Sequence, residues 1–430
     1  FKAYVVGGAV RDSVMKRRPQ DYDVCTNARP EETKRVFSDY KIIPKGEKFG
    51  TVCVLVGRSQ VEITTFRRDG SYGDGRHPTG VEFSSELKTD LERRDFTVNA
   101  LAYNEKEGVI DLFSGKKDIE KKLIRAVGDP RERFFEDALR IMRALRLSAA
   151  LGFEMEEETK RAAIELAPSL QNISAERVRE ELMKFIVAER AGDYLLKYKE
   201  IIFAVIPELR ECDGFLQHNP FHCFDVLGHI AATVNYIDRK PVLRVTALLH
   251  DVAKPACFTM DGERGRFFGH MPASAEVARG VLKRLKFPTK FAETVRLLIE
   301  YHDRPYSPNP VDARRWLHSL GAENTYLIIR HKTADCLAHD KSYRRHLITI
   351  REFKKEVDLA LKRGDCYCLS RLAVNGRDIN ASLGVSGGQT GEMLEYLLGE
   401  VIEGRAENER ETLLIKAREH IRELKTEKRG

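Results

Sequence analysis

The sequence predicts an α+β fold in which a small mixed sheet at the N-terminus precedes an elongated, all-helical body. Short segments rich in β-branched and aromatic residues are concentrated before about residue 125. After that point, apolar residues recur at helical spacing almost to the C-terminus. Prolines interrupt this spacing and, because proline disrupts a helix interior, they mark the expected breaks between helices. The expected breaks fall at Pro168, Pro207, Pro220, Pro241, Pro288, Pro308 and Pro310.

The expected strands alternate with helices in the first part of the chain. Gly57-Arg58-Ser59-Gln60 separates two of them and predicts a hairpin. The expected strands are Tyr4–Val6, Asp21–Val24, Thr51–Val56, Val61–Phe66 and Val109–Leu112.

A chain of 430 residues is too long for a single hydrophobic core and predicts two to four domains. We expect a head at 1–125, a helical neck at 126–210, a further helical domain at 211–345 and a C-terminal helical tail at 346–430. The chain begins at Phe1 instead of methionine, so we expect a few leading residues before it.

The composition narrows the class of protein. A formal net charge of +7, from 73 basic and 66 acidic residues, is a mild excess that permits an anionic partner without requiring one. The eight cysteines are scattered without a C-x-x-C pair, which favours reduced thiols over disulfides or a zinc ribbon. No apolar run approaches the length of a membrane span and no secretory signal opens the chain, so we expect a cytoplasmic protein without membrane contact.

The most informative motif joins a glycine turn to a pair of carboxylates. An apolar strand runs into Gly7 and Gly8, whose turn opens a helix and can approach phosphates. The next strand carries Asp21 and Asp23, which alternation places on the same face. Each feature alone is common in surface turns, but together they describe a site for a nucleoside triphosphate and Mg²⁺. The expected chemistry is nucleotidyl transfer.

A second cluster lies in an expected helix over 92–100. Asp95 and Asn99 stand one turn apart there, and both can face the sugar of a bound nucleotide. The alternative is a capped helix with a local ion pair.

A third cluster lies in Phe134–Arg140. Asp137 and Arg140 share one helical face, where a carboxylate and a guanidinium in fixed register can offer hydrogen bonds to a base edge. The alternative is an ordinary i,i+4 salt bridge between Glu136 and Arg140.

The helical body contains a separate constellation of candidate metal ligands. His250-Asp251 ends the apolar run 242–249. Imidazole nitrogens and carboxylate oxygens suit a hydrated divalent metal, and the alternative is a set of scattered surface histidines. The other candidate ligands are His222, His270, His302 and Asp335.

Taken together, the first three motifs resemble one known family, the bacterial class II CCA-adding tRNA nucleotidyltransferases. The related poly(A) polymerases share the same core. Segments 372–384 and 391–398 resemble the C-terminal tRNA-binding region of the family. The elements that match in order and approximate spacing are Gly7-Gly8-Ala9-Val10-Arg11-Asp12, Asp21-x-Asp23, Arg93-Arg94-Asp95-Phe96-Thr97-x-Asn99-Ala100 and Glu136-Asp137-x-x-Arg140.

The resemblance implies a nucleotidyltransferase palm at 1–125. Asp21 and Asp23 would bind two Mg²⁺ ions that hold the attacking 3′-hydroxyl and the triphosphate. Gly7, Gly8 and Arg11 would cradle the triphosphate.

The resemblance also implies how the nucleotide is chosen. Arg94, Asp95 and Asn99 would contact its ribose and phosphates. Asp137 and Arg140 would read the Watson–Crick edge of CTP or ATP, so that protein replaces a nucleic-acid template.

The segment Ala247-Leu248-Leu249-His250-Asp251-Val252-Ala253-Lys254 resembles the signature of the metal-dependent HD phosphohydrolases. HD domains joined to this nucleotidyltransferase sometimes hydrolyse phosphomonoesters or 2′,3′-cyclic phosphates, which would suit tRNA end repair. Mn²⁺, Ni²⁺ or Fe²⁺ would suit such a site. The implied ligands are His222, His250, Asp251 and Asp335 for one metal and His270 and His302 for a second, with His229 in a supporting position.

Basic residues in the expected neck would bind tRNA through its phosphates and shape, with little reading of sequence. A loop at Arg67–Pro78 contains Tyr72-Gly73-Asp74-Gly75-Arg76, which matches the Tyr-x-Asp-x-Arg loop of the family. This match favours full CCA addition, and the alternative is an ordinary glycine-rich connection. The expected RNA contacts are Arg143, Arg146, Arg177 and Arg179.

Several alternatives remain open from the sequence. On the same scaffold, the protein could be a poly(A) polymerase or an enzyme that adds only CC or only A. From other classes, it could be an HD phosphodiesterase acting on small nucleotides or a non-catalytic RNA-binding protein. The sequence allows a monomer or a homodimer.

Overall fold

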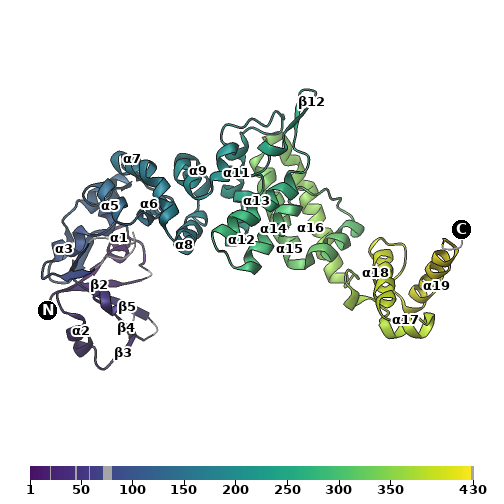
Figure 1. The fold of residues 1–430 in the computed structure, drawn as a ribbon, viewed down its shortest axis with the longest axis horizontal. Coiled ribbons are helices and arrows are strands. Elements are labelled where there is room, and N and C mark those ends of the chain that lie inside the picture. The colour runs from purple at the N-terminus through teal and green to yellow at the C-terminus, as the bar shows by residue number, and fades with distance from the viewer. Residues whose placement is uncertain (20, 44–45, 58, 71–79, 428–430) are drawn as a thin grey trace. The chain divides into compact units, whose positions relative to one another are not determined.

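The computed structural model describes residues 1–19, 21–43, 46–57, 59–70 and 80–427, which fold into two compact units. Figure 1 shows a sheet near the N-terminus and helices along the rest of the chain, as the sequence predicts. In this described part of the chain, no helix is long and apolar enough to cross a membrane. Our finer division into four domains stays a prediction. The first unit comprises Phe1–Phe215, Arg239–Arg244 and Arg279–Ala292, and the second comprises Leu216–Asp238, Val245–Ala278 and Glu293–Gly430.

A seven-stranded mixed sheet organises the first unit, with strand order β3-β4-β5-β2-β1-β8-β9. Neighbouring strands are antiparallel except β2 and β5, which run parallel. The predicted hairpin is confirmed, because β4 and β5 pair from Val56 and Ser59 outward. The strands are β1 (Ala3–Val6), β2 (Asp23–Thr26), β3 (Lys41–Ile43), β4 (Thr51–Val56), β5 (Ser59–Thr65), β8 (Leu101–Asn104) and β9 (Gly108–Asp111).

The first strand leads directly into the glycine turn. Alternation buries Tyr4 and Val6 in the core of the sheet. The backbone then turns at Gly7, whose φ of +73° and ψ of −135° are rarely adopted by residues with a side chain. The helix α1 (Gly8–Val14) follows at once, as predicted. Because Val6 pairs with Asp23, the turn and the start of β2 lie at the same edge of the sheet.

Helices make up most of the remainder of the first unit. The helix α6 buries Ile141, Met142 and Leu145 and packs against α8. These helices are α2 (Pro30–Val36), α3 (Leu87–Glu92), α4 (Gly115–Lys121), α5 (Pro130–Glu136), α6 (Leu139–Leu151), α7 (Glu157–Leu166), α8 (Ala175–Ile186), α9 (Ala191–Lys197) and α10 (Lys199–Val205). Shorter elements are η1 (Glu47–Phe49), β6 (Arg67–Asp69), β7 (Val81–Phe83), η2 (Thr97–Asn99), β10 (Leu123–Ile124), β11 (Glu154–Met155), η3 (Ala167–Asn172) and η4 (Pro207–Cys212).

The prediction of a helix over 92–100 is wrong. The backbone at Phe96 is extended and forms a β-bridge with Ala126. Because this pairing satisfies the backbone in place of a helix, only the single 3-10 turn η2 forms. Tertiary pairing of this kind cannot be seen in local spacing.

A second expected helix is interrupted at Asp137. Its φ of −144° and ψ of 101° are extended, so α5 ends one residue earlier. The Asp137 Oδ1 atom accepts a hydrogen bond from Leu139 N at 3.0 Å, which starts α6. The salt bridge that we gave as the alternative for this cluster is present, with Glu136 Oε2 lying 2.6 Å from Arg140 Nη1.

The remaining part of the chain is helical, with one hairpin that the sequence does not predict. In this hairpin β12 (Thr259–Asp261) pairs antiparallel with β13 (Arg264–Arg266). The helix α15 is broken at Gly321, where φ is +71°. The helices from residue 226 onward are α11 (Val226–Tyr236), α12 (Pro241–Leu249), α13 (His270–Arg284), α14 (Thr289–Tyr301), α15 (Pro310–Ala338), α16 (His346–Arg363), α17 (Gly376–Leu383), α18 (Gly388–Ile402) and α19 (Arg410–Glu427). Single 3-10 turns are η5 (Pro255–Cys257), η6 (Lys341–Arg345) and η7 (Leu369–Arg371).

Candidate active site and metal centre

A cavity of about 900 Å³ opens in the first unit beside the turn between β1 and α1. Residues from the sheet, from η2 and from α6 line it. All the residues that the sequence predicts for Mg²⁺ and the nucleotide lie on its wall. They are Gly7, Gly8, Arg11, Asp21, Asp23, Arg94, Asp95, Asn99, Asp137 and Arg140.

The carboxylates of Asp21 and Asp23 lie at the start of β2. Burial raises the pKa of Asp23, the nearby Arg94 guanidinium opposes this rise, and the Asp21 carboxylate adds to it. Two carboxylates that repel each other in this way favour a divalent cation between them, because the cation neutralises both charges. The donor set therefore fits Mg²⁺, which prefers oxygen ligands.

The structure adds Glu62, which the sequence did not single out. Glu62 of β5 pairs in register with Asp23 of β2 and lines the same cavity. The sequence carries one signal for it, an acidic residue between two apolar ones in an expected strand. Its proximity to Asp23 depends on the parallel pairing of the two strands, which local pattern does not reveal.

The glycine turn and Arg94 form the next part of the wall. A Cβ atom at Gly7 would lie 3.1 Å from Arg94 Nη1, so a side chain here would crowd the guanidinium. The fully buried Asp90 carboxylate lies 3.2 Å from Arg94 Nη2 and holds it in place. A bare backbone turn beside a fixed guanidinium suits the binding of phosphate groups.

A chain of hydrogen bonds fixes the polar groups between the turn and α6. Arg11 Nη1 donates to Asn99 Oδ1 at 2.7 Å, and Asn99 Nδ2 donates to Asp95 Oδ1 at 3.1 Å. Arg143 Nε donates to the other Asp95 oxygen at 2.8 Å. Burial alone would raise the pKa of Asp95, but the Arg143 guanidinium and these hydrogen bonds lower it to about 2. Asp95 is therefore charged at neutral pH and orients its neighbours.

Asp137 and Arg140 are also held in fixed orientations. Arg140 Nη1 donates to Glu136 Oε2 at 2.6 Å, and its Nη2 donates to the Arg93 carbonyl oxygen at 3.1 Å. Asp137 Oδ2 accepts a hydrogen bond from Arg177 Nη2 at 2.8 Å. A carboxylate and a guanidinium locked in this way present one acceptor and one donor direction to a bound molecule.

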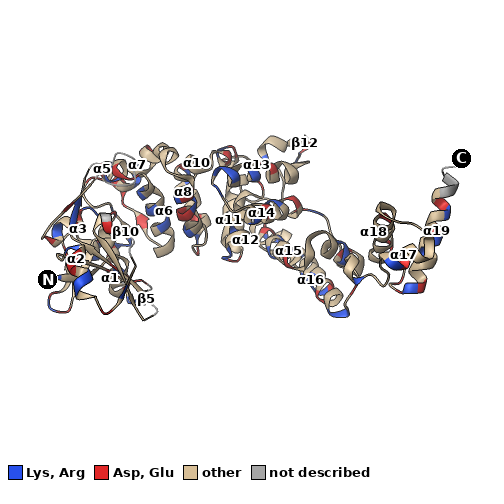
Figure 2. Ribbon diagram, turned by 60° about the horizontal axis from the view of Figure 1, so that its bottom comes forward, with Lys and Arg blue, Asp and Glu red and all other residues tan. Residues whose placement is uncertain are grey.

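Three of the four arginines expected to bind RNA lie in this cavity and pair with carboxylates. Arg146 lies 2.7 Å from the buried Glu181, while Arg143 and Arg177 hold Asp95 and Asp137. The ribbon in Figure 2 is coloured blue at the Lys and Arg positions of α6 and α8, the helices from which these residues come. The fourth, Arg179, donates to the Lys286 carbonyl oxygen. Their contact with RNA stays a prediction.

The buried Asp95 is expected to make the stability of the first unit depend on acid. Its folded pKa of about 2 lies below the ordinary 3.8, so it stabilises the fold above pH 4 and loses this effect as the pH falls toward 2. Its contribution at pH 7 is about 2 kcal/mol, and about half is lost by pH 3. Urea unfolding of the wild type and of Asp95→Asn at pH 7, 5, 4 and 3 measures it. Asp39→Asn, which changes an exposed carboxylate, is the control. If the difference in unfolding free energy between the wild type and Asp95→Asn does not change with pH, Asp95 does not cause the acid dependence.

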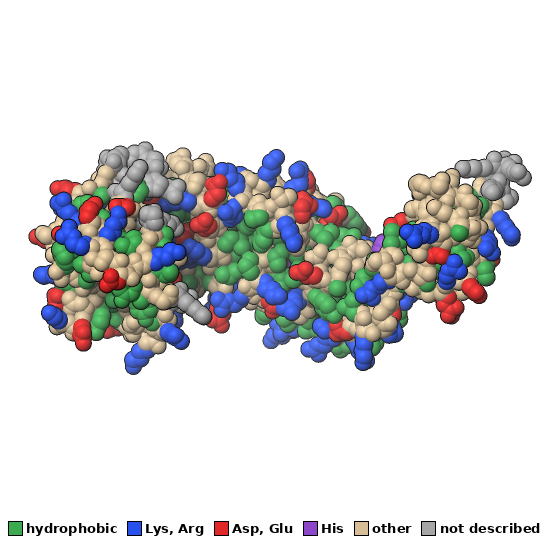
Figure 3. All heavy atoms as spheres, turned by 90° about the horizontal axis from the view of Figure 1, so that it is seen from below, with side chains coloured by type: hydrophobic (Ala, Val, Ile, Leu, Met, Phe, Trp, Pro, Cys, Tyr) green, Lys and Arg blue, Asp and Glu red, His purple; other side chains and the backbone are tan. Residues whose placement is uncertain are grey.

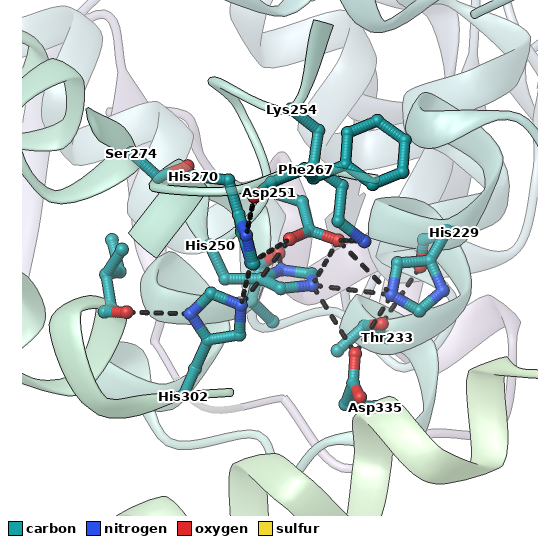
Figure 4. Close-up of polar contacts among 12 residues, drawn as sticks. His229, Thr233, His250, Asp251, Lys254, Phe267, His270, Ser274, His302 and Asp335 are labelled. Atoms are coloured by element: carbon teal, nitrogen blue, oxygen red, sulfur yellow. Dashed lines mark hydrogen bonds and ion pairs between the residues drawn. The ribbon is translucent and has the colours of Figure 1, made fainter. Parts of the chain in front are cut away.

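The second constellation surrounds a cavity of about 390 Å³ in the second unit. Figure 4 shows imidazole and carboxylate groups from different helical segments of the second unit pointing toward one another. Asp251 is at the centre. Its Oδ2 lies 3.1 Å from His250 Nε2, and its Oδ1 lies 3.5 Å from His302 Nε2 and 3.6 Å from His270 Nε2.

The histidine ring nitrogens indicate a cation site. His250, His270 and His302 each direct Nδ1 at a carbonyl oxygen three residues earlier, at 2.7 to 2.8 Å, so Nδ1 carries the proton. The Nε2 atoms of His270 and His302 then face each other at 3.2 Å. In neutral rings these are two lone pairs, which attract only a proton or a metal ion placed between them. This arrangement is typical of metal-binding histidines held by backbone carbonyls.

The charge of the cluster supports the same conclusion. Burial would lower the pKa of His250, but the carboxylates of Asp251 and Asp335 raise it to about 10. The two acidic groups thus draw a positive charge into a buried site. A divalent metal ion would supply that charge, so the donor set fits the metal that the sequence predicts.

His229, which we expected in a supporting position, lies closer to the Asp335 and His250 groups than its role predicts, while His222 stays a candidate ligand in a group with His229 and His339. Its Nε2 atom lies 2.9 Å from Asp335 Oδ1 and 3.4 Å from His250 Nε2. His222 lies farther out, with its ring packed against His229 and His339 at centroid distances of 5.4 and 4.4 Å. The geometry favours His229 as the ligand beside His250. The sequence signal for His229 is its position in the apolar helix α11, where its side chain is buried.

Lys254 is a further residue that the sequence did not single out as functional. Its Nζ lies 2.7 Å from Asp251 Oδ2 and 3.1 Å from Gln217 Oε1, to which it donates. Figure 4 shows the side chain reaching the cluster beside the Phe267 ring, whose centroid is 5.3 Å from Nζ. A cation at this point suits the binding of a phosphate next to the metal ligands.

Three family models match this chain. A poly A polymerase head domain matches residues 3–125, a probable RNA and SrmB-binding site of polymerase A matches 152–212, and an HD domain matches 220–338. The predicted loop motif Tyr72–Arg76 lies outside the described residues.

Curated relatives and solved structures agree with these models. A CCA-adding enzyme of Enterococcus faecalis is 32% identical over 420 residues, which cover 96% of this chain and 91% of that protein. A CCA-adding enzyme of Streptococcus suis is 49% identical over 189 residues, which cover 44% of this chain. In this comparison and in those with similar relatives, the aligned part spans about half the length of the relative. The crystal structure of the Bacillus stearothermophilus CCA-adding enzyme in complex with CTP is 26% identical, with a TM-score of 0.73 over 99% of this chain and 95% of that one.

Proposed function

This chain belongs to the CCA-adding enzyme family, and we propose that it adds C, C and A to the 3′ end of tRNA from CTP and ATP, without a nucleic-acid template. One observation carries the proposal. The cavity of the first unit gathers the paired carboxylates, the phosphate-binding turn and the Asp137–Arg140 pair on one wall.

We propose that each step of the reaction uses a distinct part of this wall. The Gly7 turn, Arg11 and Arg94 bind the triphosphate, and Asp21 and Asp23 hold two Mg²⁺ ions. These ions, when bound, supply charge neutralisation for the attacking 3′-oxygen and the leaving pyrophosphate. The 3′-oxygen bonds to the α-phosphorus as the bond to pyrophosphate breaks.

The chemistry of Asp137 and Arg140 explains a choice of C and A. Cytosine presents an amino donor beside the N3 acceptor, and adenine presents an amino donor beside N1. A carboxylate accepts from the amino group and a guanidinium donates to the ring nitrogen. Uracil and guanine present the opposite order, an acceptor beside a donor, so this pair rejects them.

The tRNA would be held mainly through its phosphates. Figure 3 shows Lys and Arg side chains spread over the visible face, with acidic side chains between them. This distribution fits binding by many separate phosphate contacts, with little reading of base sequence. Such binding suits an enzyme that accepts every tRNA.

The direct experiment uses tRNAs that end before CCA, after C and after CC. Each is incubated with Mg²⁺ and with CTP, ATP or both, and the 3′ ends are then sequenced. Completion to CCA from all three supports the proposal, while addition to only some indicates an enzyme that adds CC or A alone. A tail of A that grows beyond CCA, with no use of CTP, would instead indicate a poly(A) polymerase.

An Asp137→Ala variant is expected to relax nucleotide choice more than it slows bond formation. The lost acceptor removes roughly 1–3 kcal/mol of discrimination against the wrong base, which corresponds to a rise in misincorporation of about five- to 150-fold. Sequencing of 3′ ends formed in the presence of all four nucleoside triphosphates measures this effect. The exposed Glu132→Ala on α5 is the control. If the addition rates with CTP and with ATP fall equally and no wrong base is added, Asp137 does not select the nucleotide.

We further propose that the HD segment is a metal-dependent phosphohydrolase. The observation that favours it is the sharing of Asp251, whose two oxygens face two separate groups of histidine nitrogens. In such hydrolysis, water adds to phosphorus and the bond to the alcohol oxygen breaks. Release of phosphate from glycerol 2-phosphate with added Mn²⁺, Ni²⁺ or Fe²⁺ tests this function, and no release with any of them would oppose it.

A further inference from the structure

Three histidines form a separate group beside the HD ligands of the second unit. Each of His222, His229 and His339 offers one ring nitrogen, and these nitrogens all lie within 4.8 Å of one another. His222 precedes α11, His229 lies on α11, and His339 directly follows α15. All three members are histidines, whereas the groups around Asp251 and Asp335 each include a carboxylate. The three-histidine group is therefore expected to favour a different kind of metal ion.

The backbone and a neighbouring ring hold His222 and His339 close together. Asp340 N donates to the Phe221 carbonyl oxygen at 2.9 Å, which ties together the residues next to the two histidines. The Tyr343 ring stacks on His339, with centroids 4.4 Å apart, and packs on Phe221 at 5.4 Å. The centroids of the His222 and His339 rings are themselves 4.4 Å apart. Side chains that neighbours hold in this way can bind a metal ion with little rearrangement.

The ring nitrogens of His222 and His339 suit a metal ion. His339 Nδ1 donates to the Asp335 carbonyl oxygen at 2.8 Å, so its Nε2 atom carries the lone pair. His222 Nδ1 is buried and makes no hydrogen bond with any residue that the structure describes. A buried nitrogen in this state is unfavourable, because burial has removed its hydrogen bond to water. A metal ion bound to the His222 ring would remove this unfavourable state.

The charges around the three-histidine group permit a cation. The Asp335 carboxylate lies beside it, with Oδ2 at 3.7 Å from His339 Nδ1 and Oδ1 at 2.9 Å from His229 Nε2. A carboxylate next to neutral imidazole ligands offsets part of the charge of a divalent ion. Lys254 lines the same cavity, but its Nζ is paired with Asp251 Oδ2 at 2.7 Å. The positive charge of Lys254 is therefore largely balanced by Asp251.

We propose that His222, His229 and His339 together bind one late transition-metal ion of the Zn²⁺ class. Neutral nitrogen ligands favour Zn²⁺, Cu²⁺ or Ni²⁺ over Mg²⁺, which prefers oxygen. Three histidines leave a fourth tetrahedral position for water, and this position lies toward the cavity, which His222 and His339 line. His339 thus becomes a ligand, and His222 serves a different ion from the one proposed for Asp251. Metal binding here does not depend on the hydrolase function proposed above.

The number of Zn²⁺ ions bound per chain, measured in excess Mg²⁺, tests the site. Mg²⁺ occupies sites made of oxygen ligands and competes poorly for imidazole. At the lowest buffered free Zn²⁺ concentration that saturates the wild type, His222→Gln and His339→Gln are each expected to bind one ion fewer. His318→Gln changes an exposed histidine outside the group and should bind as the wild type does. Thermal unfolding without metal shows that each variant is folded, and two independent variants keep the test open if one is not.

The visible absorption of bound Co²⁺ separates this ion from the one proposed for Asp251. Four-coordinate Co²⁺ absorbs visible light far more strongly than six-coordinate Co²⁺, so the spectrum reports the tetrahedral geometry. The strong absorption is expected in the wild type and in Asp251→Asn, and it should be lost in His222→Gln and His339→Gln.

Two results would overturn the inference. One is an unchanged number of bound Zn²⁺ ions in His222→Gln and His339→Gln. The other is loss of the strong Co²⁺ absorption in Asp251→Asn, which would mean that the histidines belong to the site of Asp251. If the wild type shows the zinc site but releases no phosphate from glycerol 2-phosphate with any metal, the hydrolase function fails and the zinc site stands.

Discussion

An Asp23→Asn variant is expected to lose nucleotide addition by roughly a thousand-fold or more while it stays folded. The lost carboxylate removes a proposed ligand for Mg²⁺, and metal stabilisation of the transition state amounts to several kcal/mol. The substitution should not lower the stability of the fold. Burial and the Asp21 carboxylate raise the pKa of Asp23, so a charged carboxylate at this position is unfavourable for folding. Single-turnover addition of CMP to a tRNA that lacks CCA measures the rate.

The same experiment contains its own controls. Asp39→Asn changes an exposed carboxylate of the head that does not line the cavity, and its rate should match the wild type. Urea unfolding of Asp23→Asn should give a free energy of unfolding equal to or above that of the wild type. An active Asp23→Asn would remove the carboxylate pair from the proposed mechanism, and an unfolded one would show that Asp23 has a structural role.

Much of the head could be predicted because its signals are local. Gly7 and the Asp21-x-Asp23 pair lie within one strand–turn–helix–strand stretch, where turn chemistry predicts the glycine turn. The predicted strand Asp21–Val24 starts too early, because β2 begins at Asp23, so alternation along the strand does not place Asp21. Glu62 reaches the same cavity through pairing between β2 and β5, which are more than thirty residues apart in sequence. Neither strand alone contains information about that neighbour.

The neck shows a different limit. The three-residue spacing of Arg140, Arg143 and Arg146 gives a basic stripe along α6, and all three side chains line the cavity. It cannot tell whether the stripe meets solvent, RNA or protein. Arg143 and Arg146 pair with Asp95 and Glu181, which come from other elements of the first unit. Glu181 meets Arg146 because α6 packs against α8, and Asp95 meets Arg143 from the segment between α3 and η2, so local spacing predicts neither partner.

The candidate metal ligands of the second unit show how the position of a helix start decides between two nearby histidines. His222 and His229 both precede His250-Asp251 and differ by seven residues, which is close to two helical turns. The structure begins α11 at Val226, so only His229 stands on the helix and turns its ring toward Asp335. His222 precedes that helix, and spacing counted in helical turns does not apply to it.

An Asp251→Asn variant is expected to abolish Mn²⁺ binding in the second unit while nucleotide addition stays intact. The two Asp251 oxygens face both groups of histidine nitrogens, so the substitution removes the acceptor that the two groups share. In the wild type, Mn²⁺ at a hundred times its dissociation constant should raise the free energy of unfolding by about 2.7 kcal/mol. In an Asp23→Asn background, which removes the proposed metal site of the first unit, Asp251→Asn should show no such rise.

Thermal unfolding with and without Mn²⁺, followed by measurement of bound metal after dialysis, distinguishes the outcomes. Glu263→Gln, an exposed change on the turn between β12 and β13, should bind metal as the wild type does. Asp251 helps to raise the pKa of His250 against the effect of burial. Replacing Asp251 therefore also lowers the pKa of His250 and makes its buried positive charge less favourable. If Asp251→Asn still binds Mn²⁺ and is stabilised by it, the metal lies elsewhere in the chain. If CCA addition falls together with metal binding, the two activities depend on each other in a way that separate cavities do not explain.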